Sequence, residues 1–183
     1  MSLLSAVELL ELVEQDVITN VDRSSINAAS IDVHLGTDFL VEVDRRYSKL
    51  DGTMPSIDLS KREKPEMHRF KNNVLLSPGD FCLASTIEMF NMPDNISGQF
   101  MLKSSIARSG LEHLMAGFID PGFNNSVLTL ELINVLRYSN ILISAGMAIG
   151  QVIFFKHNTV PAEFSYRTKG RYNCDKTTQE SKP

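Results

Sequence analysis

The feature that most restricts the fold of this 183-residue chain is a series of short apolar stretches separated by turn sequences. The turns include Ser77-Pro-Gly, Met92-Pro-Asp-Asn and Ala145-Gly. The stretches between them have the length and the β-branched and aromatic content of strands, so the chain is expected to be mainly β, as a sandwich, jelly roll or barrel. Strands are predicted at 31–35, 39–43, 73–76, 80–89, 96–101, 127–134, 141–144 and 148–155.

The remaining segments are expected to be a helix, a hairpin and an excursion. Ser5 and Glu8 match a capping box, and Val7, Leu10 and Val13 recur at helical spacing, which predicts a short N-terminal helix over about residues 6–15. The stretches 31–35 and 39–43 are expected to form a hairpin across 36–38. The polar stretch 44–72 is expected to be a long excursion within one domain, because strand patterns resume after it.

Composition restricts the partners and the location. The formal net charge of −4 argues against broad nucleic-acid binding, so any polyanion site has to be local. The sequence has no apolar run of membrane-spanning length and no basic-then-apolar leader. Cys82 and Cys174 lie far apart, which is typical of free thiols. We therefore expect a cytoplasmic protein without a membrane or nucleic-acid polymer partner.

Two stretches carry candidate chemistry. Lys103-Ser-Ser-Ile-Ala-Arg108 puts hydroxyls and positive charge into one short turn, which suits an anionic ligand, although Ser104 or Ser105 capping a helix beside a solvated Arg108 explains it equally well. Asp120-Pro-Gly is a turn before the strand 127–134. Alternation puts Val127, Thr129 and Glu131 on one face of that strand, and Leu128, Leu130 and Leu132 on the other. An isolated Glu131 is by itself most simply a solvent-facing residue.

Several familiar catalytic motifs are absent. The sequence lacks the H-x-E and P-C-x-x-C pairs of zinc nucleotide deaminases, a Walker loop, a dinucleotide fingerprint and a G-x-S-x-G elbow. The four histidines lie on unrelated segments, so each is expected to be structural or on the surface. They are His34, His68, His113 and His157.

Taken together, seven segments in order along the chain resemble the dCTP deaminase family, the zinc-independent branch of the trimeric dUTPase superfamily. The resemblance implies a distorted jelly-roll subunit in a homotrimer, with nucleotide sites at the subunit interfaces. It also implies one β domain over 1–167 and a flexible tail, 168–183, that closes over the nucleotide. The segments are 30–35, 76–80, 86–94, 98–108, 116–123, 129–132 and 145–151.

The same resemblance implies the site residues. Lys103, Ser104, Ser105 and Arg108, in a turn with Ile106 and Ala107, would hold the triphosphate, and Mg²⁺ would bind through the phosphates without zinc or a protein metal cage. Asp120 would contact the deoxyribose, and Thr129, Leu130 and Glu131 the base. Gln151, Tyr166, Arg171 and Asp175 would complete the pocket. Glu131 would activate a water and protonate the leaving ammonia, with the water oriented by Ser104 and the Ala116 carbonyl and charge stabilised by Arg108.

Three departures from the family pattern flank these residues. The chain is one residue shorter between Gly110 and Ala116, where Met115 replaces the usual threonine, and one residue longer within 123–126. In the tail, this chain has Arg171 where the family has a lysine and Asp175 where the family has a glutamine. Either Lys176 takes the phosphate-binding role with Asp175 turned outward, or Asp175 recruits magnesium. We expect the first outcome, since 177–183 offers no other anchor for the phosphates.

The leading functional hypothesis is hydrolysis of dCTP to dUTP and ammonia. The segment 116–120 fits the bifunctional members of the family, which cleave the product further to dUMP and diphosphate. A dUTPase without deaminase activity and a non-catalytic nucleotide-binding regulator are the alternatives, and dTTP is a candidate feedback inhibitor.

Overall fold

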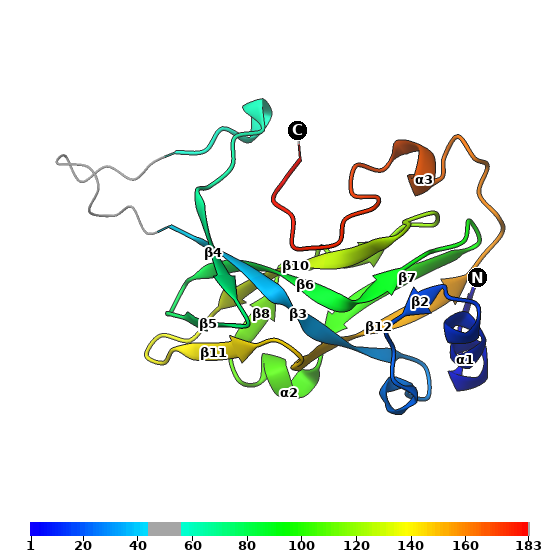
Figure 1. Ribbon diagram of the computed structural model, residues 1–183, viewed down its shortest axis with the longest axis horizontal. Helices are drawn as coiled ribbons and strands as arrows, with labels where there is room; N and C mark the ends of the chain where they lie inside the picture. The colour runs from blue at the N-terminus through cyan, green and yellow to red at the C-terminus, as the bar shows by residue number, and fades with distance from the viewer. Residues whose placement is uncertain (44–55, 183) are drawn as a thin grey trace.

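The computed structural model describes residues 1–43 and 56–182, and it confirms a mainly β fold with a short N-terminal helix (Figure 1). The described helices are α1 (Ala6–Glu14), α2 (Ser104–Ala107), α3 (Tyr166–Lys169) and the 3₁₀ turns η1 (Arg23–Ser25) and η2 (Leu59–Lys61). The described strands are β1 (Ser2–Leu3), β2 (Ile18–Thr19), β3 (Ile31–Glu42), β4 (Met67–Lys71), β5 (Asn73–Leu76), β6 (Phe81–Phe90), β7 (Ile96–Leu102), β8 (Leu111–His113), β9 (Phe118–Ile119), β10 (Ser126–Asn134), β11 (Ile141–Ser144) and β12 (Ala148–Lys156).

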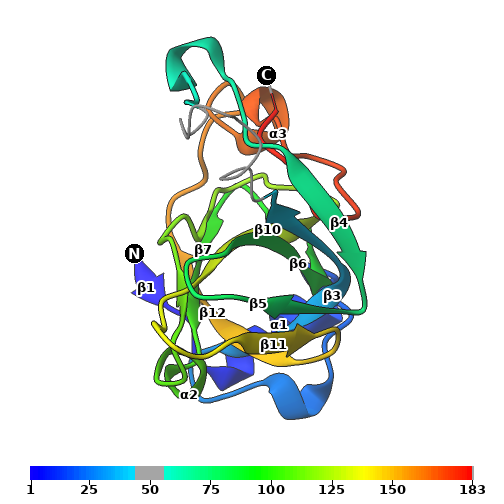
Figure 2. The ribbon, with the colours of Figure 1, turned by 90° about the vertical axis from the view of Figure 1, so that its left-hand side faces the viewer.

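The strands form one large curled sheet and a small second sheet. The main order is β8-β10-β6-β3-β12-β7-β9, all antiparallel neighbours, and β11 pairs with β5 alone. Seen from the end, the strands bend around the core, and β5 and β11 close one side of it (Figure 2). The core is aliphatic and aromatic, with Phe39, Phe90, Phe100 and Phe154 among its largest fully buried side chains. This is the distorted jelly roll that the resemblance implied.

The expected hairpin at 31–43 is wrong, because β3 runs straight through Gly36, Thr37 and Asp38 as one strand of 12 residues. Its first part pairs with β12, and its second part pairs with β4 and β6. The pairing with β6 shifts register between Leu35 and Phe39, so the strand is irregular where a turn was expected. Gly36 serves close packing there, since a Cβ would lie 2.9 Å from the Ser85 hydroxyl.

The N-terminal helix is confirmed, but its buried face differs from the prediction. Glu8 accepts a hydrogen bond from the Ser5 amide at 2.9 Å, and the Ser5 side chain accepts from the Glu8 amide, which completes the capping box. Leu9 and Leu12 are the buried side chains, whereas Val7 is 68% exposed. The i, i+3 spacing located the helix and missed the face that packs.

The polar stretch 44–72 contains more regular structure than expected. Residues 44–55 lie outside the described part of the chain, but β4 pairs along β3 from Met67 to Lys71. Residues 56–66, called the arm here, stand above the sheet beside the C-terminal segment in both views (Figures 1 and 2). Sequence patterns also missed the very short strands β1, β2, β8 and β9.

Residues 171–182, called the strap here, fold back over the sheet. Thr178 is only 1% exposed, and its hydroxyl donates to the main-chain oxygen of Asp38 at 2.7 Å. The Val127 amide donates to the Asp175 carbonyl at 2.9 Å. Thr178 therefore attaches the strap to β3. None of the helices within 1–43 and 56–182 is long and apolar enough to cross a bilayer.

Candidate functional site

A cavity of about 630 Å³ lies between the sheet, the arm and the strap. Its floor comes from β6 and β10, and one wall from the segment 116–123. Of the predicted site residues it brings together Ala116, Asp120, Thr129, Glu131, Tyr166, Arg171 and Asp175. Such a volume is in the usual range for a small-molecule site.

Glu131 points into this cavity from the middle of β10. The neighbouring Leu130 and Leu132 are buried in the core, so the predicted alternation holds here, and Leu130 has only its main chain available on the cavity side. The alternation fails at Leu128, which also lines the cavity, because the register with β6 shifts between Val127 and Thr129. The irregularity leaves Thr129 and Glu131 facing the same space.

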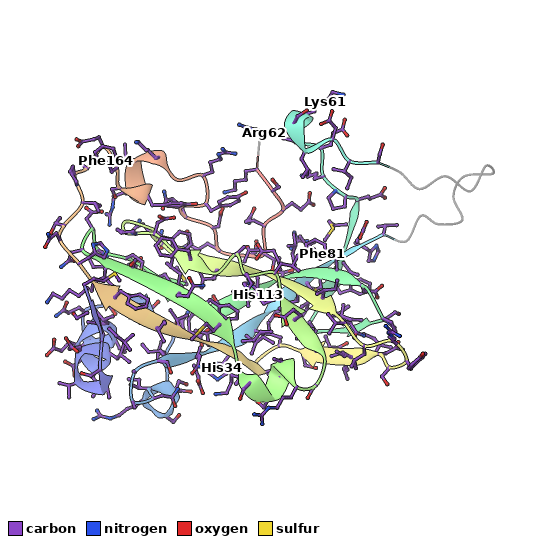
Figure 3. The ribbon with its side chains drawn as sticks, turned by 180° about the vertical axis from the view of Figure 1, so that it is seen from behind. His34, Lys61, Arg62, Phe81, His113 and Phe164 are labelled. Atoms are coloured by element: carbon purple, nitrogen blue, oxygen red, sulfur yellow. The ribbon has the colours of Figure 1, made fainter. Side chains whose placement is uncertain are left out.

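His113 is the residue whose importance sequence reasoning missed. Its Nε2 lies 3.4 Å from Glu131 Oε2, and both atoms are buried without a hydrogen-bond partner. The ring is 4% exposed and packs edge-on against Phe100 at 4.8 Å (Figure 3). His113 is thus buried, within the expected choice of structural or surface, and its ring faces the Glu131 carboxylate. His113 reaches Glu131 because β8 pairs with β10 and places His113 opposite Leu132. No local sequence pattern reveals this pairing.

Asp120 and Tyr166 lie together at one end of the cavity. Phe123 donates its amide to the Asp120 carbonyl at 3.1 Å, which closes the predicted turn, and Tyr166 donates its own to Pro121 at 2.9 Å. The Tyr166 ring packs edge-on against Phe123 at 5.5 Å. Partial burial raises the pKa of the Asp120 carboxyl. It is also the main cause of the raised pKa of the Tyr166 hydroxyl. Gly117 allows the backbone of β7 to come close, since a Cβ at position 117 would lie 2.8 Å from the Phe100 carbonyl oxygen.

The strap supplies the opposite wall, with a charge arrangement that corrects our prediction for Lys176. Both carboxylate oxygens of Asp175 accept from Lys182 Nζ at 2.7 Å, so Asp175 faces the cavity with its charge paired. Lys176 instead bonds Asn125 and lies outside the cavity lining. A lysine seven residues further along thus neutralises the Asp175 carboxylate.

The phosphate turn, residues 103–108, lies outside this cavity. Lys103 forms an ion pair with Asp32, and Gln151 accepts from the Ser30 hydroxyl at 2.9 Å. Ser104, Ser105, Ala107 and Arg108 are exposed, while Ile106 packs against the core. Lys103, rather than either serine, occupies the cap position of α2. One chain therefore does not bring the turn and Glu131 together. The lining of the cavity includes neither Gln151 nor any residue of the turn.

The departures around the pocket coincide with unusual backbone. Met115 and Asn125 both have left-handed conformations, with φ of 62° and 52°. Asparagine tolerates this region, whereas a long unbranched side chain such as Met115 is uncommon there. Met115 is also 82% exposed. Both residues lie in turns next to segments that line the cavity. Among the described residues, no group of three or more His, Cys, Asp or Glu side chains is placed to hold a metal ion.

The comparisons with known proteins agree with this geometry. Residues 3–157 match the family model described as dCTP deaminase-like. This chain belongs to that family. The curated "dCTP deaminase, dUMP-forming" of Streptomyces avermitilis is 41% identical over 146 residues, covering 79% of this chain and 73% of the relative. The enzyme of the same name from Mycobacterium ulcerans is 38% identical over 150 residues, covering 81% and 76%.

A solved structure supports the fold. The 2′-deoxycytidine 5′-triphosphate deaminase of Agrobacterium tumefaciens superposes with a TM-score of 0.62 at 20% identity. The match covers 83% of this chain and 48% of that one, so this chain spans about half the length of the solved deaminase. At this identity the likeness supports the arrangement of strands and not the details of the site.

Proposed function

We propose that this protein hydrolyses dCTP to dUTP and ammonia, and cleaves the dUTP to dUMP and diphosphate. The single observation that carries the deaminase part is Glu131, a half-buried carboxylate aimed into the cavity and backed by His113. A plain dUTPase would give this pair no deaminating task, and a non-catalytic regulator would not need it. Relatives at about 40% identity are named as dUMP-forming deaminases, which favours the bifunctional reading.

The chemistry at C4 of cytosine needs one carboxylate with two successive tasks. Glu131 takes a proton from water, whose oxygen bonds to C4, and then passes that proton to the amino group. The C4–N bond breaks and ammonia leaves, and the second proton of the water moves from the oxygen to N3 to give the uracil ring, so atoms and charge balance without a metal or an oxidant. Ser104 and the main-chain carbonyl of Ala116 orient the water, and Arg108 stabilises charge near the reacting centre. His113 holds Glu131 toward C4.

The complete site would form between copies of the chain. The phosphate turn and the cavity are separate surfaces of one chain, and Ser104 and Arg108 are needed beside Glu131. A homotrimer would bring the turn of one copy to the cavity of the next, a heterologous contact that closes into a ring. Large apolar side chains lie exposed around the cavity wall and the adjacent loops, as an interface between copies requires. They include Leu114, Met115, Phe118, Val135 and Tyr138.

The ligands of this site complete the proposal. Asp120 and Tyr166 would contact the deoxyribose, Thr129 and the main chain of Leu130 the base, and Lys103, Ser105, Arg108, Gln151 and Arg171 the phosphates. Mg²⁺ would enter with the triphosphate, bound through its oxygens. The strap would close over the nucleotide as a mobile part of the tail 168–183, attached to the domain 1–167. The feedback ligand would be dTTP, which shares the triphosphate and the pyrimidine.

The experiment is direct. Purified protein is incubated with dCTP and Mg²⁺, ammonia is measured, and dUTP is separated from dUMP. Equal amounts of ammonia and dUMP support the bifunctional enzyme, and ammonia with dUTP alone supports a deaminase. Conversion of dUTP to dUMP without ammonia from dCTP would establish the plain dUTPase instead. Binding of dCTP without any product would establish the regulator.

A further inference from the structure

The cavity extends past Glu131 into a part that the contacts proposed for dCTP leave unused. We call it the side chamber, and apolar side chains from the arm, β4 and β6 line it. Figure 3 shows Phe81 at the sheet and the arm, marked by Arg62, above it. An ion pair of 2.5 Å between Lys64 Nζ and Glu180 Oε2 ties the arm to the strap and so holds the chamber's outer wall. Its apolar lining residues are Leu59, Pro65, Met67, Phe81 and Leu83, and the charged arm residues Arg62, Glu63 and Lys64 line the same cavity.

The position of the chamber relative to Glu131 follows from strand register. Leu83 on β6 is the direct cross-strand partner of Glu131, and Phe81 lies two residues further along the same face. On the other side of β10 lies β8, from which His113 approaches the carboxylate. Glu131 therefore has an apolar neighbour on one flank and a polar neighbour on the other.

A cytosine ring has matching asymmetry around the atom that reacts. Its C4 is bonded to N3, a hydrogen-bond acceptor, on one side and to C5, which carries only hydrogen, on the other. With C4 facing Glu131, the lower cost of desolvation places N3 toward the polar flank and C5 toward Leu83. The side chamber then begins where a substituent on C5 would point.

We infer that the side chamber receives an alkyl group on C5, and that the protein also deaminates 5-methyl-dCTP. The inference rests on the proposed function and concerns its substrate class. Water adds to C4 and ammonia leaves as before, while the methyl group stays on C5, so the products are dTTP and ammonia. No further reactant is needed. Burying one methyl group against Leu83 favours binding by about fourfold, which offsets its small electron-donating effect on C4.

The first test compares the two substrates on the intact protein. Ammonia release is followed with dCTP and with 5-methyl-dCTP, separately and in competition. The expected result is a kcat/KM for 5-methyl-dCTP within about tenfold of that for dCTP, whereas a pocket closed at C5 costs about a hundredfold for one methyl group. A loss of that size with dCTP still deaminated overturns this inference and leaves the proposed function standing. If neither nucleotide releases ammonia, this inference and the proposed deaminase function are both wrong.

The second test fills the chamber. Leu83→Phe puts a larger ring beside Glu131 and is expected to lower kcat/KM for 5-methyl-dCTP about tenfold or more while changing dCTP about threefold or less. Ile87→Phe on the same strand, outside the cavity lining, is the matched control and is expected to leave the ratio unchanged. Leu59→Trp narrows the chamber from the arm at an 82% exposed position, so it serves where Leu83→Phe does not fold. An equal loss for both substrates in Leu83→Phe and Leu59→Trp contradicts the inference.

Discussion

The cavity and the phosphate turn are opposite kinds of surface on one chain. The cavity is concave and lined by residues that strand pairing and the strap hold in place, including Glu131, whose carboxylate contacts a buried histidine. The turn is a four-residue helix with exposed hydroxyls and an exposed Arg108, and its one ion pair joins Lys103 to Asp32. Chemistry on the base needs a pocket that excludes water, and one chain can form such a pocket by itself. Phosphate binding needs donors that stay accessible, which a neighbouring copy can deliver.

The largest effect should come from removing the acid-base group of the cavity. Glu131→Gln keeps the size of the side chain and loses the proton acceptor, so ammonia release should fall about a thousandfold or more, while the Kd for dCTP changes little. Single-turnover ammonia release and equilibrium dCTP binding measure the two. Glu112→Gln, an exposed position on the adjacent β8, is the control. Near-normal turnover in Glu131→Gln would contradict the proposed mechanism.

The next effect tests the turn. Arg108→Ala should raise KM for dCTP and lower kcat, with a total loss of about 10- to 150-fold from one charge-assisted contact worth about 1.5–3 kcal/mol. Deoxycytidine binding should be affected much less, and Arg23→Ala, exposed on η1 and outside the cavity lining, should behave as wild type. Equal weakening of dCTP and deoxycytidine would show that Arg108 does not bind phosphate.

A mixture of these two variants tests whether the surfaces meet across copies. When Glu131→Gln and Arg108→Ala chains are unfolded together and refolded, about a quarter of the sites in random trimers would pair two intact surfaces. Activity should therefore return to about a quarter of the wild-type value. Light scattering measures the trimer in parallel. A fully active monomer, or no recovery from mixed trimers, would mean that both surfaces act within one chain.

A smaller effect is expected from the strap. Thr178→Val is close in shape and removes the hydroxyl that donates to the Asp38 carbonyl, a bond worth about 1 kcal/mol, so KM for dCTP should rise about fivefold with little change in kcat. Thr177→Val, one residue earlier and exposed, is the matched control. If the two variants had the same KM, the anchor would not govern closure of the cavity.

The smallest effect concerns pH. A hydrogen bond from Lys71, followed by one from Arg69, holds the pKa of Asp38 below its usual range. The stabilisation is thus present above the ordinary value of about 3.9 and is lost as pH falls through the lower folded value. Because Lys71 and Arg69 are about half exposed, we expect about 1 kcal/mol. Urea unfolding between about pH 5 and about pH 2 should show this loss in wild type and not in Asp38→Asn. An unchanged slope in that variant would contradict it.

What the sequence could predict depended on how local each cause is. Strand 127–134 and the capping box at Ser5 follow from neighbours in the chain, and both are confirmed. The straight course of β3 through Gly36 depends on Ser85, which is distant in sequence. A turn was the reasonable local interpretation of Gly-Thr-Asp, and tertiary pairing overrode it.

The site shows the same division. Asp120, Thr129 and Glu131 were named from motifs, and the cavity gathers them. The contact between His113 and Glu131, the neutralisation of Asp175 by Lys182 and the arm's place in the cavity wall all join segments that lie far apart or were expected to be loose. Charge pairing across such distances leaves no local pattern, so sequence reasoning missed these contacts.

The unbroken course of β3 has a consequence for how sites would communicate. Asp32, near its start, holds Lys103 of the phosphate turn, and Asp38, six residues later and about 20 Å away, anchors the strap of the cavity. In a ring of three copies, these two ends belong to different nucleotide sites. Strand pairing holds β3 on both sides of its irregular centre, so we expect displacement at one end to reach the other. Saturation with dCTP would then be sigmoidal, because binding at one site would raise the affinity of the next.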